Sequence, residues 1–325
     1  MVGLGGSGLN AVAEALRLGR SVVGLDAGTV GSGAAGRNGG FLLAGLPDFY
    51  HRAVARLGRE RAAAIYRLTL DELDGMDFRR VGSERRADSP EEADDCAAML
   101  DSLRADGFPA EPLPGGVLLP TDGAFDPLAR CRALAAQVVG KGARLFEGTR
   151  WPSGIQAGVT VVAVDGGLET LFPELAGRVR TARLQMLATE PTTAVTIPRP
   201  VYARWGYDYW QQLPDGRLAI GGCRDRFLDG EWSTDPTPTG AVQSCIEGVL
   251  RDRVGVPDHV AVTHRWAGCV GFTDDHMPVC EEVRPGVFAV GGYSGTGNVL
   301  GALYGRAAVR LALGEPLREL EPLAG

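Results

Sequence analysis

The sequence lacks an apolar segment of the roughly 18–20 residues that a membrane-spanning helix needs. It also lacks the basic start, apolar stretch and cleavage site of a secretory signal peptide, so we expect a cytoplasmic protein. An excess of positive charge is missing as well. The formal net charge is -7, and the arginines are interspersed with acidic residues. Phosphate backbones are bound by clustered positive charge, so these features argue against a nucleic-acid partner.

Cysteine pairs with the spacing of a zinc or redox site are also missing. No cysteine lies near a histidine at the spacing of metal ligands, so the sequence predicts no metal site. We expect reduced and mostly buried thiols, as is usual for a cytoplasmic protein. The six cysteines are Cys96, Cys131, Cys223, Cys245, Cys269 and Cys280.

Glycine, in contrast, is abundant, and many of its 47 residues are concentrated in three places. These clusters cover residues 3–8, 31–40 and 291–301, near both ends of the chain. A flexible linker would spread its glycines evenly. We therefore expect three segments in which the backbone turns tightly or lies close to another group.

The expected secondary structure is that of an α/β protein. Residues 9–16 form an apolar helical stripe that Gly19 terminates, and residues 21–25 form a short buried strand that ends at Asp26. This strand–helix–strand unit is the start of a parallel sheet. Residues 159–164 are rich in valine and predict a central buried strand.

The rest of the chain predicts further helices and a second, antiparallel sheet. With 325 residues, the chain is long enough for two domains. Residues 181–223 and 259–271 alternate apolar and polar side chains, which is typical of antiparallel strands. Helices are expected over 48–76, from a capping box at Ser89 to about Arg104, over 126–140 and over 299–313.

The first glycine cluster, Gly3-Leu4-Gly5-Gly6-Ser7-Gly8, has the GxGxxG spacing of a dinucleotide fingerprint. Gly3 allows the tight turn, Gly5 lets a pyrophosphate approach the backbone, and Gly8 lets helix and strand pack closely. Asp26 follows Gly8 at close to the spacing of about 20 residues expected for the carboxylate that binds the ribose. The whole cluster is therefore expected at the phosphates of a dinucleotide, at the start of the next helix.

The second cluster continues as Gly33-Ala34-Ala35-Gly36-Arg37-Asn38-Gly39-Gly40, just beyond Asp26. It resembles a loop of the D-amino-acid-oxidase-like (DAO) superfamily of FAD enzymes, which includes glycine oxidase, sarcosine oxidase and γ-glutamylputrescine-oxidase-like proteins. The resemblance implies that Arg37 and Asn38 lie beside the pyrophosphate and the flavin. It assigns FAD contacts to Ala35, Gly36, Arg37, Asn38, Gly39 and Gly40.

The third cluster, Gly291-Gly292-Tyr293-Ser294-Gly295-Thr296-Gly297-Asn298, precedes the last expected helix and also resembles this superfamily. In such enzymes the loop closes over the flavin, and the helix behind it points its N-terminus at the pyrimidine end of the ring. A helix N-terminus stabilises the negative charge that develops there. The resemblance assigns FAD contacts to Gly292, Ser294, Gly295, Thr296, Gly297 and Asn298.

The resemblance covers nearly the whole chain and predicts an α/β fold with two interleaved domains. One is a Rossmann-like (βαβ) FAD-binding domain, and the other is an α+β substrate domain built on an antiparallel sheet. The FAD-binding domain is expected to comprise residues 1–45, 122–185 and 281–325, and the substrate domain residues 46–121 and 186–280.

The resemblance also implies an oxidoreductase that transfers a hydride from the α carbon of a small amine to flavin N5. The imine is then hydrolysed, and oxygen or a carrier accepts the electrons. A glycine or D-amino-acid oxidase or dehydrogenase on the same scaffold is an alternative. A cofactor-free member with a binding role is another, because only Met1 and Val2 precede Gly3.

The substrate side is expected among arginines and aromatic residues. Amino-acid oxidases of the superfamily bind the substrate carboxylate through an arginine shortly after a Trp-Ala-Gly segment. This chain has Val270 at about that position, after Trp266-Ala267-Gly268. The loss of a bidentate carboxylate partner favours an amine, or an amino acid that is bound by Arg224 or Arg204 instead.

The aromatic side chains are expected to wall an apolar substrate site. Tyr207 and Tyr209 are two residues apart, so on a strand they face the same side. Because the cofactor performs the redox step, no strong protein base is needed. We expect Tyr293, Trp266, Tyr209 and His276 near the reacting atoms, and Trp210 with Arg224 at the substrate.

Overall fold

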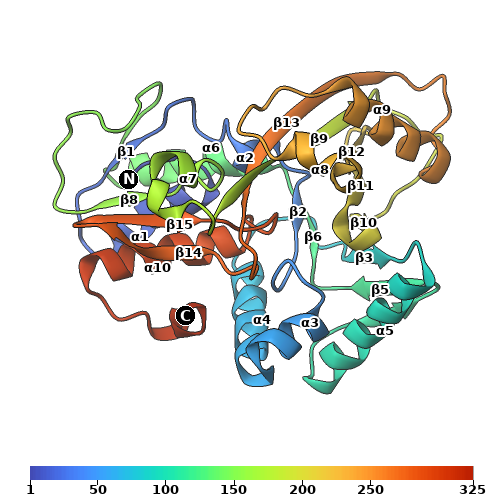
Figure 1. The fold of residues 1–325 in the computed structure, drawn as a ribbon, viewed down its shortest axis with the longest axis horizontal. Coiled ribbons are helices and arrows are strands. Elements are labelled where there is room, and N and C mark those ends of the chain that lie inside the picture. The colour runs from blue at the N-terminus through green and yellow to red at the C-terminus, as the bar shows by residue number, and fades with distance from the viewer. Residues whose placement is uncertain (325) are drawn as a thin grey trace.

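The computed structural model describes residues 1–324 and has two adjoining blocks, on the left and right of Figure 1. The left block contains both chain ends and a sheet of short strands. In it, β1 (Val23–Leu25) pairs in parallel with β7 (Arg144–Phe146). Next to them, β8 (Thr160–Val162) pairs in parallel with β15 (Val287–Gly291), which pairs antiparallel with β14 (Val279–Arg284).

Val2 occupies the place of the first strand and joins these two sets. It pairs as a single residue with both Val162 of β8 and Leu25 of β1. The N–H of Val2 donates to the carbonyl oxygen of Val161 at 2.8 Å, and the N–H of Gly3 donates to that of Leu25 at 2.8 Å. The strand–helix–strand unit expected at the start of the chain is therefore present.

Three helices cover this sheet. They are α1 (Gly6–Arg17), α6 (Pro127–Gly140) and α10 (Leu300–Leu313). Helices α1 and α10 pack closely, because a Cβ at Gly305 of α10 would lie 2.3 Å from the carbonyl oxygen of Ser7 in α1. The first and last helices of the chain thus lie side by side (Figure 1).

The right block is built on a mixed sheet of eight strands, in which only β10 and β3 pair in parallel. The antiparallel sheet expected over residues 181–223 and 259–271 is confirmed, and three strands from residues 83–119 extend it. The boundary expected at residues 185/186 falls inside β9. In sheet order the strands are β13 (Val262–Phe272), β9 (Arg180–Thr189), β12 (Leu218–Gly222), β11 (Asp208–Gln212), β10 (Val201–Ala203), β3 (Ser83–Arg86), β5 (Gly116–Leu119) and β4 (Glu111–Leu113).

The back face of this large sheet is covered by apolar packing. Trp210 of β11 and Ile220 of β12 lie opposite each other in register, and both are buried against Ile246 of α9 (Gly240–Gly248). Trp210 is only 1% exposed. Side chains alternate along a strand, so Tyr209 and the other neighbours of Trp210 face the front.

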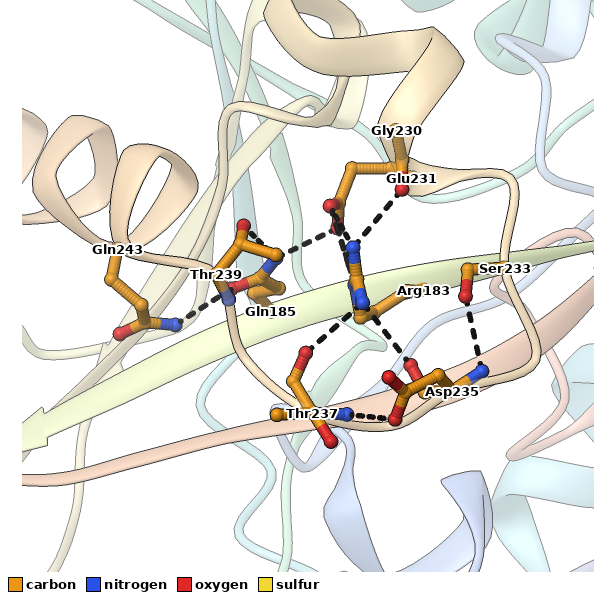
Figure 2. Close-up of polar contacts among 9 residues, drawn as sticks. All are labelled: Arg183, Gln185, Gly230, Glu231, Ser233, Asp235, Thr237, Thr239 and Gln243. Carbon is orange, nitrogen blue, oxygen red and sulfur yellow. Dashed lines mark hydrogen bonds and ion pairs between the residues drawn. The ribbon is translucent and has the colours of Figure 1, made fainter.

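A buried polar network ties one loop to the same back face (Figure 2). Arg183 of β9 forms an ion pair with Glu231 at 2.7 Å and donates to the carbonyl oxygens of Gly230 and Thr237 at 3.0 and 3.1 Å. Gln185, two residues further along β9, donates to Glu231 at 2.8 Å. The loop after β12 is therefore fixed to the sheet by charge-assisted hydrogen bonds.

Two helices replace the single helix expected over residues 48–76. They are α3 (Tyr50–Leu57) and α4 (Arg59–Asp74), separated by Gly58, which has a φ of 80°. That left-handed conformation breaks the helix and favours glycine. The helix expected after Ser89 is present as α5 (Pro90–Ala105), and the hydroxyl of Ser89 accepts a hydrogen bond from the Glu92 N–H at 3.2 Å.

A buried carboxylate ties the segment after β2 to β3 of the large sheet. Asp122 accepts hydrogen bonds from the Ala44 N–H at 3.0 Å and from the Ser83 hydroxyl at 2.6 Å. Burial raises the pKa of Asp122 to about 6, although both hydrogen bonds favour the ionised form. Asp122 thus carries an unfavourable charge in the folded protein at neutral pH.

The cysteines are not all reduced, contrary to expectation. Cys223 and Cys245 form a disulfide with their Cα atoms 6.2 Å apart, because α9 packs against the end of β12. Cys96 and Cys131 are buried free thiols, and Cys269 and Cys280 are half-buried free thiols.

The remaining short elements lie between the blocks or at their edges. Strands β2 and β6 pair with each other in antiparallel orientation. No helix in residues 1–324 is both long and apolar enough to cross a membrane. These elements are α2 (Ala34–Arg37), β2 (Phe41–Leu42), β6 (Gly123–Ala124), α7 (Leu168–Leu171) and α8 (Leu228–Glu231).

Candidate active site

A cavity of about 380 Å³ lies among the three glycine clusters; we call it the nucleotide cavity. The turn before α1, the short helix α2 and the loop before α10 all contribute to its lining. The structure therefore brings segments from both ends of the chain to one place. The predicted site residues that line this cavity are Gly3, Gly5, Gly6, Ser7, Asp26, Ala35, Asn38, Tyr293, Gly295, Gly297 and Asn298.

The first glycine cluster forms a tight turn with an uncovered backbone. A Cβ at Gly8 would lie 1.9 Å from the carbonyl oxygen of Gly3, which itself has a φ of 89°. At Gly6 a Cβ would meet no atom within 4 Å. No side chain of the described residues caps the start of α1 at Gly5, so the first N–H groups of the helix are available to a phosphate.

Four of the predicted cofactor residues, Gly8, Gly36, Gly40 and Gly292, line no cavity described here and instead allow close backbone packing. A Cβ at Gly36 would lie 2.2 Å from the Gly31 carbonyl oxygen, and one at Gly40 would lie 2.3 Å from that of Phe125. Gly292 has a φ of 78°. These glycines shape the loops that other residues of the clusters present to a ligand.

Asp26 lies at the edge of the nucleotide cavity, at the end of β1. Its two carboxylate oxygens accept hydrogen bonds from the N–H groups of Leu4 at 2.7 Å and Gly28 at 2.8 Å. These bonds hold the carboxylate beside the first glycine turn. Each oxygen has a second lone pair that a ribose hydroxyl can use.

The second and third clusters are joined through their asparagines. The amides of Asn38 and Asn298 donate to each other's oxygen, both at 3.1 Å, and Asn298 also donates to the Phe41 carbonyl oxygen at 2.8 Å. Arg37 uses its guanidinium to bind the carbonyl oxygens of Ser32 at 2.7 Å and Ala267 at 3.1 Å. Asn38 and Asn298 therefore hold the two loops together, and Arg37 fixes the second cluster to β13.

Asp165, shortly after β8, fixes the backbone of the third cluster by hydrogen bonds. One carboxylate oxygen accepts from the N–H groups of Gly292 at 2.9 Å and Tyr293 at 3.1 Å, and the other from Gly271 at 3.3 Å. Burial raises the pKa of Asp165 to about 6, although these hydrogen bonds act to lower it. Tyr293 is only 4% exposed, and its hydroxyl lies 2.7 Å from that of Ser7. Tyr293 thus connects the first and third clusters.

A second cavity of about 520 Å³ adjoins the first; we call it the substrate cavity. Both are lined by Ala34, Asn38, Val270, Gly295 and Asn298, so the two spaces meet at the glycine loops. The predicted residues Arg37, Gly39, Ser294, Thr296, Tyr209, Arg224 and His276 line the substrate cavity.

The floor of the substrate cavity is the front face of the eight-stranded sheet. One row across the strands pairs Arg85 with Tyr202, Tyr202 with Tyr209, and Tyr209 with Gly221. The Tyr209 ring lies over Gly221, where a Cβ would come within 2.5 Å of it. Phe41 packs edge-on against Tyr209, with ring centroids 6.1 Å apart. The row continues through Met186 to Trp266.

Trp266 and Trp210 line neither cavity. The indole N–H of Trp266 donates to the carbonyl oxygen of Arg37 at 2.7 Å, so this side chain supports the second glycine cluster. Trp210 is buried on the back face, where it has no surface to offer a substrate. Arg204 is already paired with Asp208 at 3.0 Å and with Asp225.

His276 lies at the rim of the substrate cavity with an acidic partner. Its Nδ1 lies 2.9 Å from a carboxylate oxygen of Asp48, and the other oxygen of Asp48 lies 3.2 Å from Arg56. Burial acts to raise the pKa of Asp48, but the hydrogen bonds and charges of His276 and Arg56 outweigh it and lower that pKa. This pair joins the loop after β13 to the start of α3.

The sequence matches the DAO family, described as FAD dependent oxidoreductase, over residues 2–311. The chain belongs to this family. FAD is therefore its cofactor, and both the resemblance drawn from the glycine clusters and the predicted fold class are confirmed.

Individual relatives agree with this assignment. The chain is 27% identical to "Probable oxidoreductase OrdL" of Rhizobium meliloti (strain 1021), over 97% of this chain and 82% of the relative. The fold is similar to that of glycine oxidase from Geobacillus kaustophilus, with a TM-score of 0.77, 21% identity and coverage of 97% and 94%. It is also similar to L-proline dehydrogenase from P. horikoshii, with a TM-score of 0.76, 19% identity and coverage of 97% and 93%.

The residues of the nucleotide cavity fit FAD. The uncovered backbone at Gly6 and the start of α1 would hold the pyrophosphate, and Asp26 would hold the ribose. The flavin ring would lie where the two cavities meet, beside the asparagine-linked loops. Sequence reasoning missed Asp165 and Arg130. Arg130 lines the nucleotide cavity from α6 and donates to the Asn298 carbonyl oxygen at 3.1 Å.

Proposed function

We propose that this protein oxidises the carbon–nitrogen bond of a small amine bound in the substrate cavity. One observation carries the proposal: the substrate cavity shares lining from the second and third glycine clusters with the nucleotide cavity. A ligand in it therefore lies against the flavin end of the cofactor. The similar folds are named for the oxidation of glycine and L-proline, and both compounds contain a C–N bond.

The protein's own residues bind and orient the substrate. FAD, held by the residues of the nucleotide cavity, would supply the acceptor for a hydride from the carbon beside the nitrogen; the nitrogen would give its proton to water, and the released imine would be hydrolysed. Tyr209, Tyr202 and Phe41 form an apolar wall that keeps water from the reacting carbon. Their packed rings limit the positions of the substrate, which is how an enzyme raises the rate of a transfer between bound groups.

The charges in the lining favour an amine that also carries a carboxylate. Four arginines face the substrate cavity against one aspartate, Asp48, which is already paired with His276 and Arg56. Such a lining attracts anions and repels simple cationic amines. Val270 lies where the cavities meet and offers no carboxylate contact, so an arginine elsewhere in the lining has to supply it.

Anaerobic reduction of the FAD-loaded protein tests this function. Simple amines, glycine, sarcosine, L-proline, and the two enantiomers of alanine would be added separately, and bleaching of the flavin absorbance would be followed. We expect amino acids to bleach the flavin faster than the matching amines. If no amine bleaches a fully loaded protein, the proposal fails. A colourless protein that FAD does not stabilise against heat would instead support the cofactor-free alternative.

The electron acceptor is tested in the second half of the same reaction. The reduced protein would be mixed with oxygen or with an artificial dye, and the return of the flavin absorbance would be timed. Rapid recovery in oxygen, with formation of hydrogen peroxide, indicates an oxidase, and recovery with the dye alone indicates a dehydrogenase.

A further inference from the structure

Arg224 lies in a box of aromatic rings at one side of the substrate cavity. Its guanidinium carbon is 4.5 Å from the ring centroid of Phe272, 5.0 Å from that of Trp232 and 5.8 Å from that of Tyr207. One of its terminal nitrogens is buried without a hydrogen-bond partner in the described residues. Asp225, the next residue, pairs with Arg204 instead. The Arg224 charge is thus held in place but not neutralised.

The box is built on the buried network of the back face. Trp232 follows Glu231 directly, and Glu231 is fixed by Arg183 and Gln185 of β9 (Figure 2). The Trp232 ring packs edge-on against Phe272, with centroids 6.0 Å apart. The rings around Arg224 therefore have a rigid support, as a preformed binding site requires.

A second guanidinium with a buried, unpartnered nitrogen among the described residues faces the same cavity from β3. Arg85 stacks over the ring of Tyr202, with its guanidinium carbon 4.7 Å from the centroid. Its Nε is buried without a hydrogen-bond partner in residues 1–324. Its charge acts to lower the pKa of the buried Asp122, which is bonded to Ser83 and Ala44 instead. Arg52, by contrast, is paired with Asp95.

We propose that Arg224 and Arg85 bind two separate acidic groups of one substrate, so that the amine oxidised here is an amino dicarboxylate. This inference rests on the proposed function, since it names the substrate class of the same site. A partly buried cation without a partner is unfavourable, and an anionic ligand at each guanidinium removes that cost. One carboxylate would satisfy only Arg224 or Arg85.

The two guanidiniums reach the substrate cavity from different parts of the sheet. Arg85 of β3 lies over Tyr202 of β10, and Arg224 follows β12 and lies beside Tyr207, the residue before β11. Both arginines line the same cavity of about 520 Å³. A substrate with several carbon atoms between its acidic groups can therefore contact both.

Binding of non-oxidisable acids to the FAD-loaded protein tests the inference without turnover. Succinate, glutarate and adipate would each be compared with the monocarboxylate of equal chain length: butyrate, pentanoate and hexanoate. The change of the flavin absorbance would report binding. We expect at least one diacid to bind about tenfold or more tightly than its monoacid, as a second charge-assisted contact predicts. Equal affinity in all three pairs would overturn the inference.

Variants then locate the two contacts. Arg85→Gln and Arg224→Gln should each reduce the diacid affinity about tenfold and abolish the preference over the monoacid. Arg86→Gln removes the same charge from the neighbouring residue, which pairs with Glu84 and points away from the floor row, so it should retain the preference. FAD content and thermal unfolding would show whether each variant is folded.

The outcomes separate the two proposals. A diacid preference that survives Arg85→Gln or Arg224→Gln overturns the inference. If amines reduce the flavin but diacids bind no better than monoacids, the proposed function stands and the dicarboxylate inference fails. If no amine reduces the flavin, the proposed function fails, and the binding series still shows whether the two arginines form an anion site.

Discussion

Gly221 of β12 provides the space for the Tyr209 ring on the cavity floor. A Cβ at residue 221 would lie 2.5 Å from two atoms of the Tyr209 ring, Cε2 and Cζ, and from its hydroxyl oxygen. This is roughly 1 Å closer than ordinary contact between non-bonded atoms. The φ of Gly221 is not left-handed, so Gly221→Ala introduces a steric overlap without backbone strain. Phe41 and Tyr202 flank the ring, with centroids 6.1 and 5.8 Å away, so it has to shift into the substrate cavity.

We expect Gly221→Ala to cost about 1–3 kcal/mol of the free energy of unfolding, which is the usual penalty for overfilling a packed site. The shifted ring narrows the substrate cavity, so the substrate concentration that half-saturates flavin reduction should rise. The FAD content should not change, because neither residue lines the nucleotide cavity. Urea unfolding of the loaded protein and anaerobic flavin reduction measure these effects. Gly268→Ala is a matched control, since its Cβ would lie at an ordinary 3.5 Å from Ala34.

A double-mutant cycle isolates the overlap. Tyr209→Ala removes the ring, so Gly221→Ala should cost about 1–2 kcal/mol less in that background than in the parent. If Gly221→Ala costs the same in both backgrounds, the ring does not lie on Gly221. Our description of the cavity floor would then be wrong.

Three further predictions concern the cofactor cavity and the core. Gly8→Ala should abolish FAD retention, measured as flavin absorbance of the purified protein, because its Cβ would lie 1.9 Å from the Gly3 carbonyl oxygen. Trp266→Phe should weaken FAD binding about fivefold in a titration while leaving substrate saturation unchanged, because it removes the hydrogen bond to Arg37. Asp122 has a pKa raised to about 6, so its contribution to stability is present below about pH 4 and is lost as the pH rises through 6. The free energy of unfolding should therefore fall by about 2–3 kcal/mol between pH 4 and pH 7 in the parent protein, and Asp122→Asn should abolish this decrease. Urea unfolding at each pH measures it.

Local patterns predicted much of the fold. The GxGxxG turn, the capping box at Ser89 and the alternating segments each depend on neighbouring residues, so the sequence shows them directly. The break at Gly58 was missed although a glycine inside a helical pattern is a known signal. Strand β3 was missed because Ser83–Arg86 has no apolar alternation, and it becomes a strand only by pairing with β10 and β5.

The site residues were predictable where the alternation of side chains along a strand decides which face they occupy. Alternation along β11 places Tyr209 on one face and Trp210 on the other, so the sequence already contained the signal against Trp210 as a substrate contact. Tyr207 lies before β11, outside the reach of this rule, although it also lines the substrate cavity. Trp266 and Asp165 are different. Trp266 acts through a hydrogen bond to Arg37, and Asp165 through the N–H groups of the third glycine cluster. Both contacts join residues far apart in the sequence, so no local pattern could indicate them.

The buried arginines on the two faces of the large sheet differ in their hydrogen-bond and ion-pair partners. On the back face, Arg183 is neutralised by Glu231 and saturated by hydrogen bonds. On the front face, Arg224 and Arg85 keep buried nitrogens without partners in the described chain. The same fold evidently can satisfy a buried arginine, and an unsatisfied one lowers stability. Under the proposed dicarboxylate binding, an anionic substrate would pair with both guanidiniums of this cavity and offset that loss of stability.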